Sequence, residues 1–76
     1  MANWKQKTEV VGGTTYPERI IDSDKLLRMM AQAHFEKQAG ADFTLKAETN
    51  EKYEIVTYIF VRKMKDRTVI NRFEKM

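Results

Sequence analysis

The chain has 76 residues, of which 42% are apolar and 33% charged, and it contains no cysteine. This length suffices for one domain with one small core, and the composition is typical of a folded chain rather than of a disordered one. The lack of cysteine excludes disulfides, zinc–thiolate sites and thiol nucleophiles, and the net charge of +3 is concentrated in residues 61–76.

The N-terminus and the apolar runs argue against export and membrane insertion. The first segment carries Lys5 and Lys7 and is not followed by the apolar stretch of a secretory signal. The run without a charged residue at 55–61, like every other such run in the sequence, is much shorter than the roughly 20 residues that cross a bilayer as a helix. We therefore expect a single cytoplasmic domain that spans residues 1–76.

The N-terminal segment predicts a β-hairpin. Residues 4–11 mix polar and β-forming side chains, and Gly12 and Gly13 separate them from residues 14–16, a pattern typical of a tight turn between strands. Pro17 has no backbone N–H to donate, so we expect the second arm to be a short edge segment that ends near it. The chain then leads into a helix.

The next segment predicts an amphipathic helix over residues 23–39. Asp22, Ser23 and Asp24 offer N-cap candidates and first-turn carboxylates, and Gly40 offers a stop. With 100° of rotation per residue, apolar residues gather in a stripe along one side of this helix. We expect that side to pack against the rest of the protein. The predicted stripe comprises Leu26, Leu27, Met30, Ala31 and Ala33.

From residue 42 the apolar pattern changes to the two-residue period of a strand. Phe43, Leu45 and Ala47 alternate with polar residues, a turn follows at 49–52, and 53–64 is predicted as the longest strand. The last predicted elements are a turn at residues 65–67 and a strand at residues 68–74.

These elements predict a small α+β fold with the order β-β-α-β-β-β. The three C-terminal strands form an antiparallel meander, and the amphipathic helix packs on one of its faces. The N-terminal hairpin either extends an edge of the meander or folds over its other face.

The longest predicted strand is apolar on both faces near its centre. One face carries isoleucine and valine side chains, and the other carries Val56, Tyr58 and Phe60. One helix cannot cover both faces, so the second set packs under the hairpin with Trp4 or forms an exposed patch for a partner. The predicted partner-binding residues are Val56, Tyr58, Phe60 and Met64.

The basic C-terminal end is the strongest charge signal. Its cations gather around one strand–turn–strand unit near Tyr58 and Phe60, a combination suited to holding phosphates and stacking bases. Neighbours such as Arg62 and Lys63 point to opposite faces, however, and such charges also protect edge strands from aggregation. The predicted nucleic-acid-binding residues are Arg62, Lys63, Lys65, Arg67 and Arg72.

No residue pattern indicates catalysis. His34 is the only histidine, lies within the predicted apolar stripe and has no ligand-spaced partner, so we interpret it as a partly buried structural residue. The pair Gly12-Gly13 lacks the lysine and the following helix of a phosphate-binding loop. The sequence predicts neither an enzyme nor a bound cofactor or metal.

In size, in its lack of cysteine and in the absence of a catalytic signature, the chain resembles the small accessory and inhibitor proteins of bacteria and their phages. This resemblance is one of class and assigns no residue. It implies a regulatory or inhibitory protein that acts through protein–protein contact, on a larger partner or on a second copy of itself in a homodimer. The alternative is a small nucleic-acid-binding protein that uses the basic C-terminal end. The salt dependence of binding distinguishes these two functions, because phosphate binding weakens steeply with ionic strength.

Overall fold

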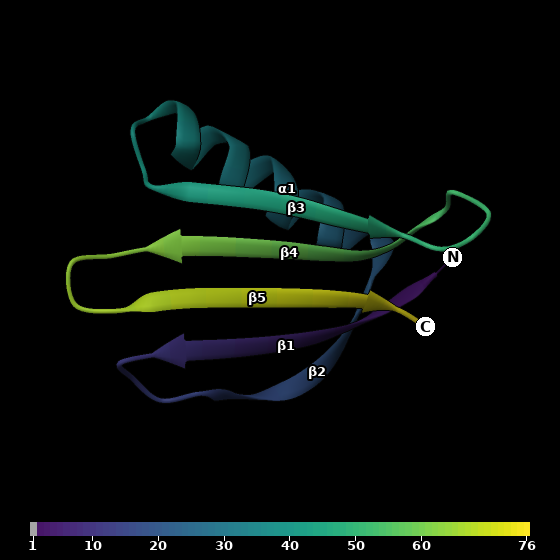
Figure 1. The fold of residues 1–76 in the computed structure, drawn as a ribbon, viewed down its shortest axis with the longest axis horizontal. Helices are drawn as coiled ribbons and strands as arrows, with labels where there is room; N and C mark the ends of the chain where they lie inside the picture. The colour runs from purple at the N-terminus through teal and green to yellow at the C-terminus, as the bar shows by residue number, and fades with distance from the viewer. Residues whose placement is uncertain (1) are drawn as a thin grey trace.

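The computed structural model describes residues 2–76 and confirms the predicted α+β fold with the order β-β-α-β-β-β. Over these residues, five antiparallel strands and one helix form two layers (Figure 1). The strand order across the sheet is β2-β1-β5-β4-β3. The elements are β1 (Asn3–Val11), β2 (Tyr16–Asp22), α1 (Ser23–Gln38), β3 (Phe43–Thr49), β4 (Ile55–Lys63) and β5 (Thr68–Lys75).

The N-terminal hairpin extends the edge of the C-terminal meander, which is one of the two placements considered above. β1 pairs with β5 along its length, beginning with Trp4 opposite Lys75. The prediction that the second arm ends near Pro17 was wrong, because β2 continues to Asp22. Pro17 is tolerated because β2 is an edge strand, where one side of the backbone makes no ladder bonds.

Helix α1 begins and ends near the residues that the local signals predicted. The side chain of Asp22 caps the helix by accepting a hydrogen bond from the backbone N–H of Lys25 at 2.8 Å. Gly40 follows the helix with a φ of 100°, a left-handed conformation that glycine adopts without strain. The helix residues packed against the core are Leu26, Met29, Met30 and Ala33.

The core lies between α1 and one face of the sheet. Its centre is a row of aromatic rings, in which the Phe60 ring centroid lies 5.0 Å from that of Phe73 and 5.6 Å from that of Phe43. Trp4 packs on Tyr58 with centroids 5.5 Å apart. The buried apolar residues are Trp4, Val10, Ile21, Leu26, Ala33, Phe43, Phe60 and Phe73.

The helix covers the face of β4 that carries Val56, Tyr58 and Phe60, which reverses the sequence-based interpretation of the two faces. Phe60 is only 5% exposed and belongs to the core cluster. Ile59 and Val61, on the other face, are half-buried without a helix above them. The reason is size, because aromatic side chains bury more area than aliphatic ones and fill the space beneath a single helix.

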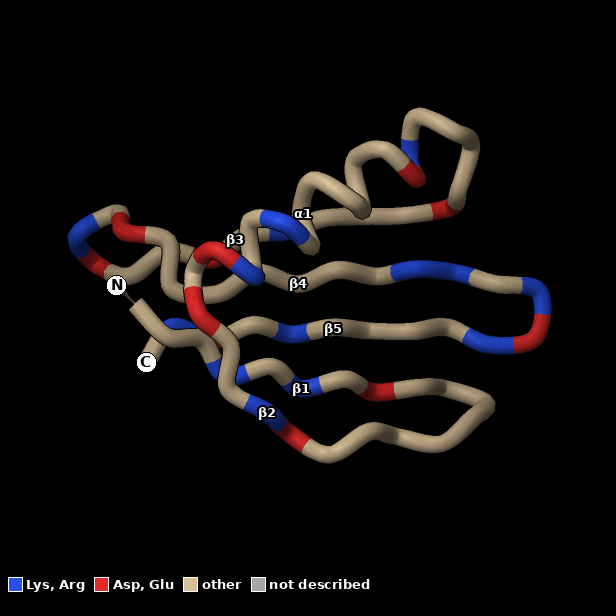
Figure 2. The backbone as a smooth tube through the Cα atoms, turned by 180° about the vertical axis from the view of Figure 1, so that it is seen from behind, with Lys and Arg blue, Asp and Glu red and all other residues tan. Residues whose placement is uncertain are grey.

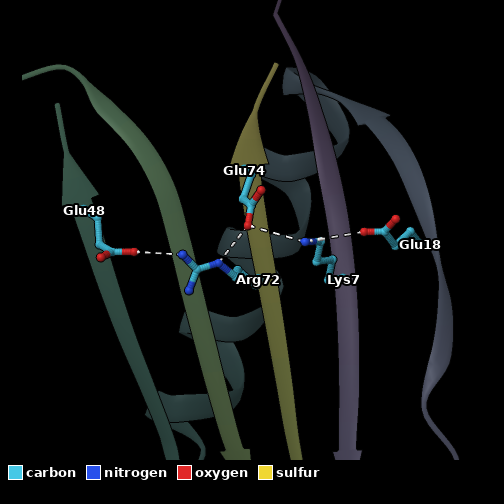
Figure 3. A network of polar contacts seen from close by, with 5 residues as sticks. All are labelled: Lys7, Glu18, Glu48, Arg72 and Glu74. Carbon is cyan, nitrogen blue, oxygen red and sulfur yellow. Dashed lines mark hydrogen bonds and ion pairs between the residues drawn. The ribbon is translucent and has the colours of Figure 1, made fainter.

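Five charged side chains cross the open face of the sheet in one line, which we call the charge row (Figure 3). Lys7 lies 3.6 Å from Glu18 and 3.8 Å from Glu74. Arg72 lies 2.9 Å from Glu74 and 3.3 Å from Glu48. The row therefore connects β2, β1, β5 and β3 on the face opposite to the helix.

The charge row also explains the burial of one small polar residue. Thr57 of β4 lies opposite both Glu48 and Glu74 in the sheet register. The contact between Arg72 and Glu48 passes over β4 (Figure 3). Long charged side chains thus cover Thr57, which is only 7% exposed on a face without a helix.

Candidate protein-binding surface

The outer side of α1 carries an apolar line that nothing in residues 2–76 covers. Leu27 and Phe35 are 61% and 68% exposed, and Ala31 between them is also exposed. Residues four apart lie on one side of a helix, so the three form a continuous line, which we call the helix stripe. A continuous apolar set is more informative than a single exposed residue, because contiguous exposed apolar patches are the ones that commonly mark interaction sites.

The observed buried side of α1 is rotated relative to the predicted stripe. Leu27 and Ala31 were predicted to face the core and are exposed, whereas Met29 packs against it. Apolar residues surround more than half of this helix, so their period alone leaves open which side meets the sheet. The hydrogen bond from the backbone N–H of Ser23 to the Ala2 carbonyl ties the start of the helix to the end of the sheet.

His34 is exposed, and the prediction of a partly buried histidine was wrong. The same rotation of the helix moves it to the solvent side, next to the helix stripe. Its Nε2 atom lies 3.2 Å from Nε2 of Gln38, one turn further along α1. The imidazole therefore makes a surface hydrogen bond within the helix.

Helix α1 also carries unpaired positive charge. Lys25, Arg28 and Lys37 are exposed and form no ion pair with any residue in 2–76. Glu36 is neutralised by an ion pair with Arg62. The helix stripe is thus an apolar line on a helix with a surplus of free cations.

The structure does not bring the four predicted partner-binding residues together on the surface. Phe60 lies in the core, and Val56 and Tyr58 are half-buried on the helix side of β4. Met64 is exposed beyond the end of β4. On α1, by contrast, Leu27 and Phe35 remain exposed.

Two of the five basic residues predicted to bind nucleic acid are held by carboxylates on opposite faces. Arg62 lies on the helix side of β4 and pairs with Glu36. Arg72 lies on the open face within the charge row, between Glu48 and Glu74. These two guanidinium groups therefore point away from each other and are already neutralised.

The other three basic residues gather at the β4–β5 turn (Figure 2). Lys63, Lys65 and Arg67 are exposed there, and Arg67 lies 3.9 Å from Asp66. The aromatic ring expected to stack bases beside them is absent from this surface, since Phe60 is buried under the helix. The turn therefore offers charge without a stacking platform.

A cavity of about 750 Å³ opens between one flank of α1 and the sheet. The rings of Phe43, Phe60 and Phe73 contribute to its lining. Three cations and three carboxylates also line it, so the cavity favours neither anions nor cations by charge. The charged lining residues are Asp22, Asp24, Lys25, Arg28, Glu36 and Arg62.

The polar end of this cavity is a hydrogen-bond network within the protein. Gln6 accepts from Nε of Arg19 at 2.6 Å and donates to Thr8 at 3.2 Å and to Asn71 at 3.3 Å. The hydroxyl of Thr8 donates to Asn71 at 2.7 Å. The buried amide of Gln6 is therefore satisfied internally, as buried polar groups usually are.

Neither a metal-binding cluster nor similarity to known proteins indicates another functional site in the described residues. No group of three or more histidine, cysteine or carboxylate side chains within residues 2–76 is arranged to hold a metal ion. The helix in this described part of the chain is not long and apolar enough to cross a membrane. Comparison of the chain with known protein families, curated proteins and solved structures finds no match.

Sequence reasoning missed Phe35 as a surface residue. The signal that could have found it is the apolar content of the helix, since seven of the ten residues from 26 to 35 are apolar. A helix that packs on a sheet with one side needs only one apolar stripe. The apolar residues beyond that one stripe predict a second contact, on the outer side of the helix.

Proposed function

We propose that this protein is a small non-enzymatic binding protein that acts through protein–protein contact at the helix stripe. The supporting observation is the line of Leu27, Ala31 and Phe35, exposed on a helix whose other side is already used in the core. Partner grooves commonly recognise helices through apolar residues spaced in this way. By occupying such a groove, the protein would regulate or inhibit a larger partner without chemistry of its own.

The proposed partner presents an apolar groove with an acidic rim. Lys25, Arg28 and Lys37 have no carboxylate partner in residues 2–76, whereas Asp24 is the one exposed carboxylate of α1 without an ion pair there, so the helix carries a surplus of positive charge. Opposite charge on the partner would steer and orient the encounter. The apolar contacts would supply most of the affinity, so moderate salt should slow association more than it weakens the complex.

Nucleic-acid binding is the second candidate. The exposed cations Lys63, Lys65 and Arg67 at the β4–β5 turn favour it (Figure 2). The pairing of Arg62 and Arg72 with carboxylates leaves fewer free charges for a phosphate track. Protein binding at the helix stripe is therefore better supported than nucleic-acid binding at the basic C-terminal end.

Affinity capture from a cell lysate tests the proposal when it is done with matched variants. We expect the wild-type protein to retain a partner protein after nuclease treatment, and the double variant Leu27→Ser/Phe35→Ser to lose it. The control is Ile20→Ser, which changes a side chain of similar exposure on β2. All three chains should have the same circular dichroism spectrum, because the substitutions are on the surface.

Two results would contradict the proposal. If the double variant retains the same partner as the wild type, the helix stripe is not the contact surface. If nuclease treatment removes all bound material, the basic β4–β5 turn is the functional surface, and binding should then weaken steeply with salt.

A further inference from the structure

The proposed function leaves the cavity between α1 and the sheet unused. Its volume of about 750 Å³ is within the range of protein sites that bind small molecules. The cavity exists because the start of α1 is fixed to β1 through Ser23, whereas the helix then runs behind β4 and β3 (Figure 1). Parts of β5 and β1 therefore stay accessible along one flank of the helix.

The apolar part of the cavity is lined by aromatic and methionine side chains. Phe43, Phe60 and Phe73 line it from the sheet, and Met29 and Ala33 line it from the helix. Met29 and Ala33 are four residues apart, so they lie on the same flank of α1. Phenylalanine rings and methionine sulfur make favourable contacts with a further aromatic ring. This part of the cavity therefore suits a planar aromatic group.

Asn71 supplies hydrogen-bond donors beside these rings. Its Oδ1 atom accepts from Nε2 of Gln6 at 3.3 Å and from the hydroxyl of Thr8 at 2.7 Å, and these two bonds fix the orientation of the amide. Every buried side-chain nitrogen or oxygen atom within residues 2–76 has a partner. The Nδ2 group of Asn71, which has none there, is therefore accessible to a ligand.

The donors of Asn71 lie close to the aromatic part of the cavity. Asn71 and Phe73 are two residues apart on β5, so their side chains point to the same face of the sheet, and both line the cavity. Two residues of a strand span about 7 Å. A ligand with a hydrogen-bond acceptor attached to its ring can therefore contact both side chains.

The charges that line the cavity balance one another. Of the three cations and three carboxylates, Arg62 and Glu36 form an ion pair, and the remaining two cations and two carboxylates cancel in sum. A charged ligand would lose hydration in the cavity without gaining a net opposite charge. The lining therefore favours an uncharged ligand.

We propose that this cavity binds a small uncharged aromatic molecule that carries a carbonyl group, such as an aromatic amide or lactam. The ring lies against Phe60 and Phe73 beside Met29, and the carbonyl oxygen accepts a hydrogen bond from Nδ2 of Asn71. Binding leaves the internal network intact, because Oδ1 of Asn71 keeps both of its present donors.

This site goes beyond the proposed function and uses a different side of α1. The helix stripe lies on the outer side of the helix, and neither Leu27 nor Phe35 lines the cavity. The variant Leu27→Ser/Phe35→Ser should therefore bind the small molecule as the wild type does. Partner capture and ligand binding can fail independently, and the cavity is tested with the purified protein alone.

An NMR titration of the wild-type protein with three one-ring probes tests the site. Benzamide is uncharged and carries a carbonyl group, whereas benzoate and benzylammonium carry a negative and a positive charge. Because a one-ring ligand has few atoms with which to gain affinity, the titration extends to about 10 mM. We expect benzamide to shift the methyl resonances of Met29 and Ala33 and the side-chain amide of Asn71. It should leave the methyl groups of Leu27 and Ile20 unshifted, and it should bind about tenfold more tightly than either charged probe.

An isosteric variant tests the hydrogen bond. Asn71→Asp keeps the acceptor for Gln6 and Thr8 but replaces the free N–H groups with a carboxylate oxygen. It should weaken benzamide binding about tenfold and make benzylammonium the preferred probe. The matched control is Asn50→Asp, which adds the same charge at a turn where Oδ1 accepts from the backbone N–H groups of Lys52 and Glu54. This control should bind benzamide as the wild type does.

Four results would overturn the proposal. The first is the absence of benzamide-induced shifts at the highest concentration, and the second is shifts confined to the helix stripe. The third is benzoate or benzylammonium binding to the wild type as tightly as benzamide, because the balance of charge would then not select the ligand. The fourth is equal benzamide binding by Asn71→Asp and Asn50→Asp. The wild-type titration requires no variant to fold.

Discussion

Arg72 organises a sheet face that has no helix above it. Its guanidinium group contacts Glu74 at 2.9 Å and Glu48 at 3.3 Å, and so connects β5 with β3 across β4. The hydrogen bond from Arg72, followed by the positive charge of Lys7, lowers the pKa of Glu74 below its ordinary value of 4.5. Single exposed ion pairs are weak, but charges that share partners order one another and shield Thr57 from water.

The lowered pKa of Glu74 predicts a pH dependence of stability. Because the native state favours the ionised carboxylate, this stabilisation is present above pH 4.5 and is lost as the pH falls through the lowered native pKa. We expect the free energy of unfolding of the wild type to fall more steeply below pH 4.5 than that of Glu74→Gln. Urea unfolding across this pH range measures it. Glu51→Gln, at an exposed turn without an ion pair, should follow the wild type, and parallel curves for all three proteins would contradict the prediction.

Phe73 is buried and Phe35 is exposed, so replacing each with alanine compares the stability contribution of the same side chain in two environments. Phe73 is 1% exposed and contacts the ring of Phe60, whereas Phe35 points into solvent. We expect Phe73→Ala to lower the free energy of unfolding by about 3–5 kcal/mol. Phe35→Ala should change it by less than about 0.5 kcal/mol, because alanine also favours the helix. Denaturant unfolding of both variants measures the difference, and similar losses would show that Phe35 is also part of the core.

The N-terminus of helix α1 is fixed to the sheet by hydrogen bonds. Asp22 ends β2 and caps the helix, so one residue belongs to both elements. The hydroxyl of Ser23 donates to the Ala2 carbonyl at 2.9 Å and accepts from Nε1 of Trp4 at 3.2 Å. These bonds fix the start of the helix against β1. They hold the start of α1 in the orientation in which Leu26 and Ala33 are buried against the sheet.

Removing the cap of α1 should destabilise the protein without changing its fold. Asp22→Ala deletes the acceptor for the backbone N–H of Lys25 and should cost about 1 kcal/mol of unfolding free energy. Asp24→Ala removes a first-turn carboxylate that accepts no cap hydrogen bond, and should cost only a few tenths of a kcal/mol through the helix dipole. Thermal unfolding of both variants measures the difference. Equal losses would mean that charge, rather than the cap, stabilises this end.

The two ends of the chain meet in the middle of the sheet. β1 pairs with β5, and the backbone N–H of Met76 donates to the carbonyl oxygen of Asn3 at 2.9 Å. Figure 1 shows the two termini at the same end of the molecule. The pairing of the first strand with the last is the least local contact of the fold. Its loop-closure entropy must be overcome before the five-stranded sheet is complete.

The proximity of the termini predicts that the chain tolerates circular permutation. A permutant that joins residue 76 to residue 2 with a short flexible linker and opens between Gly13 and Thr14 keeps every strand intact. We expect it to fold with an unfolding free energy within about 1 kcal/mol of the wild type. A permutant opened between Ile59 and Phe60 cuts β4 and should not fold. Denaturant unfolding and circular dichroism distinguish the two, and failure of the first would contradict the placement of β1 beside β5.

The order of the elements and, within a few residues, the bounds of α1, β3, β4 and β5 were predicted from local sequence patterns. These features depend on local rules: the period of apolar residues, the cap at Asp22 and the stop at Gly40. The edge position of the second arm was expected, but its extent was missed, because an edge strand tolerates a proline within it and not only at its end.

Which surfaces are buried and which remain exposed depends on how the elements pack together in three dimensions. β4 is apolar on both faces and α1 on more than half of its circumference, so periodicity could not choose between the sides of either element. The choice was made by packing, since the rings of Phe43, Phe60 and Phe73 together fill the layer under one helix. That packing placed Phe60 in the core and turned His34 and Phe35 outwards, because burial depends on contacts between residues far apart in the chain.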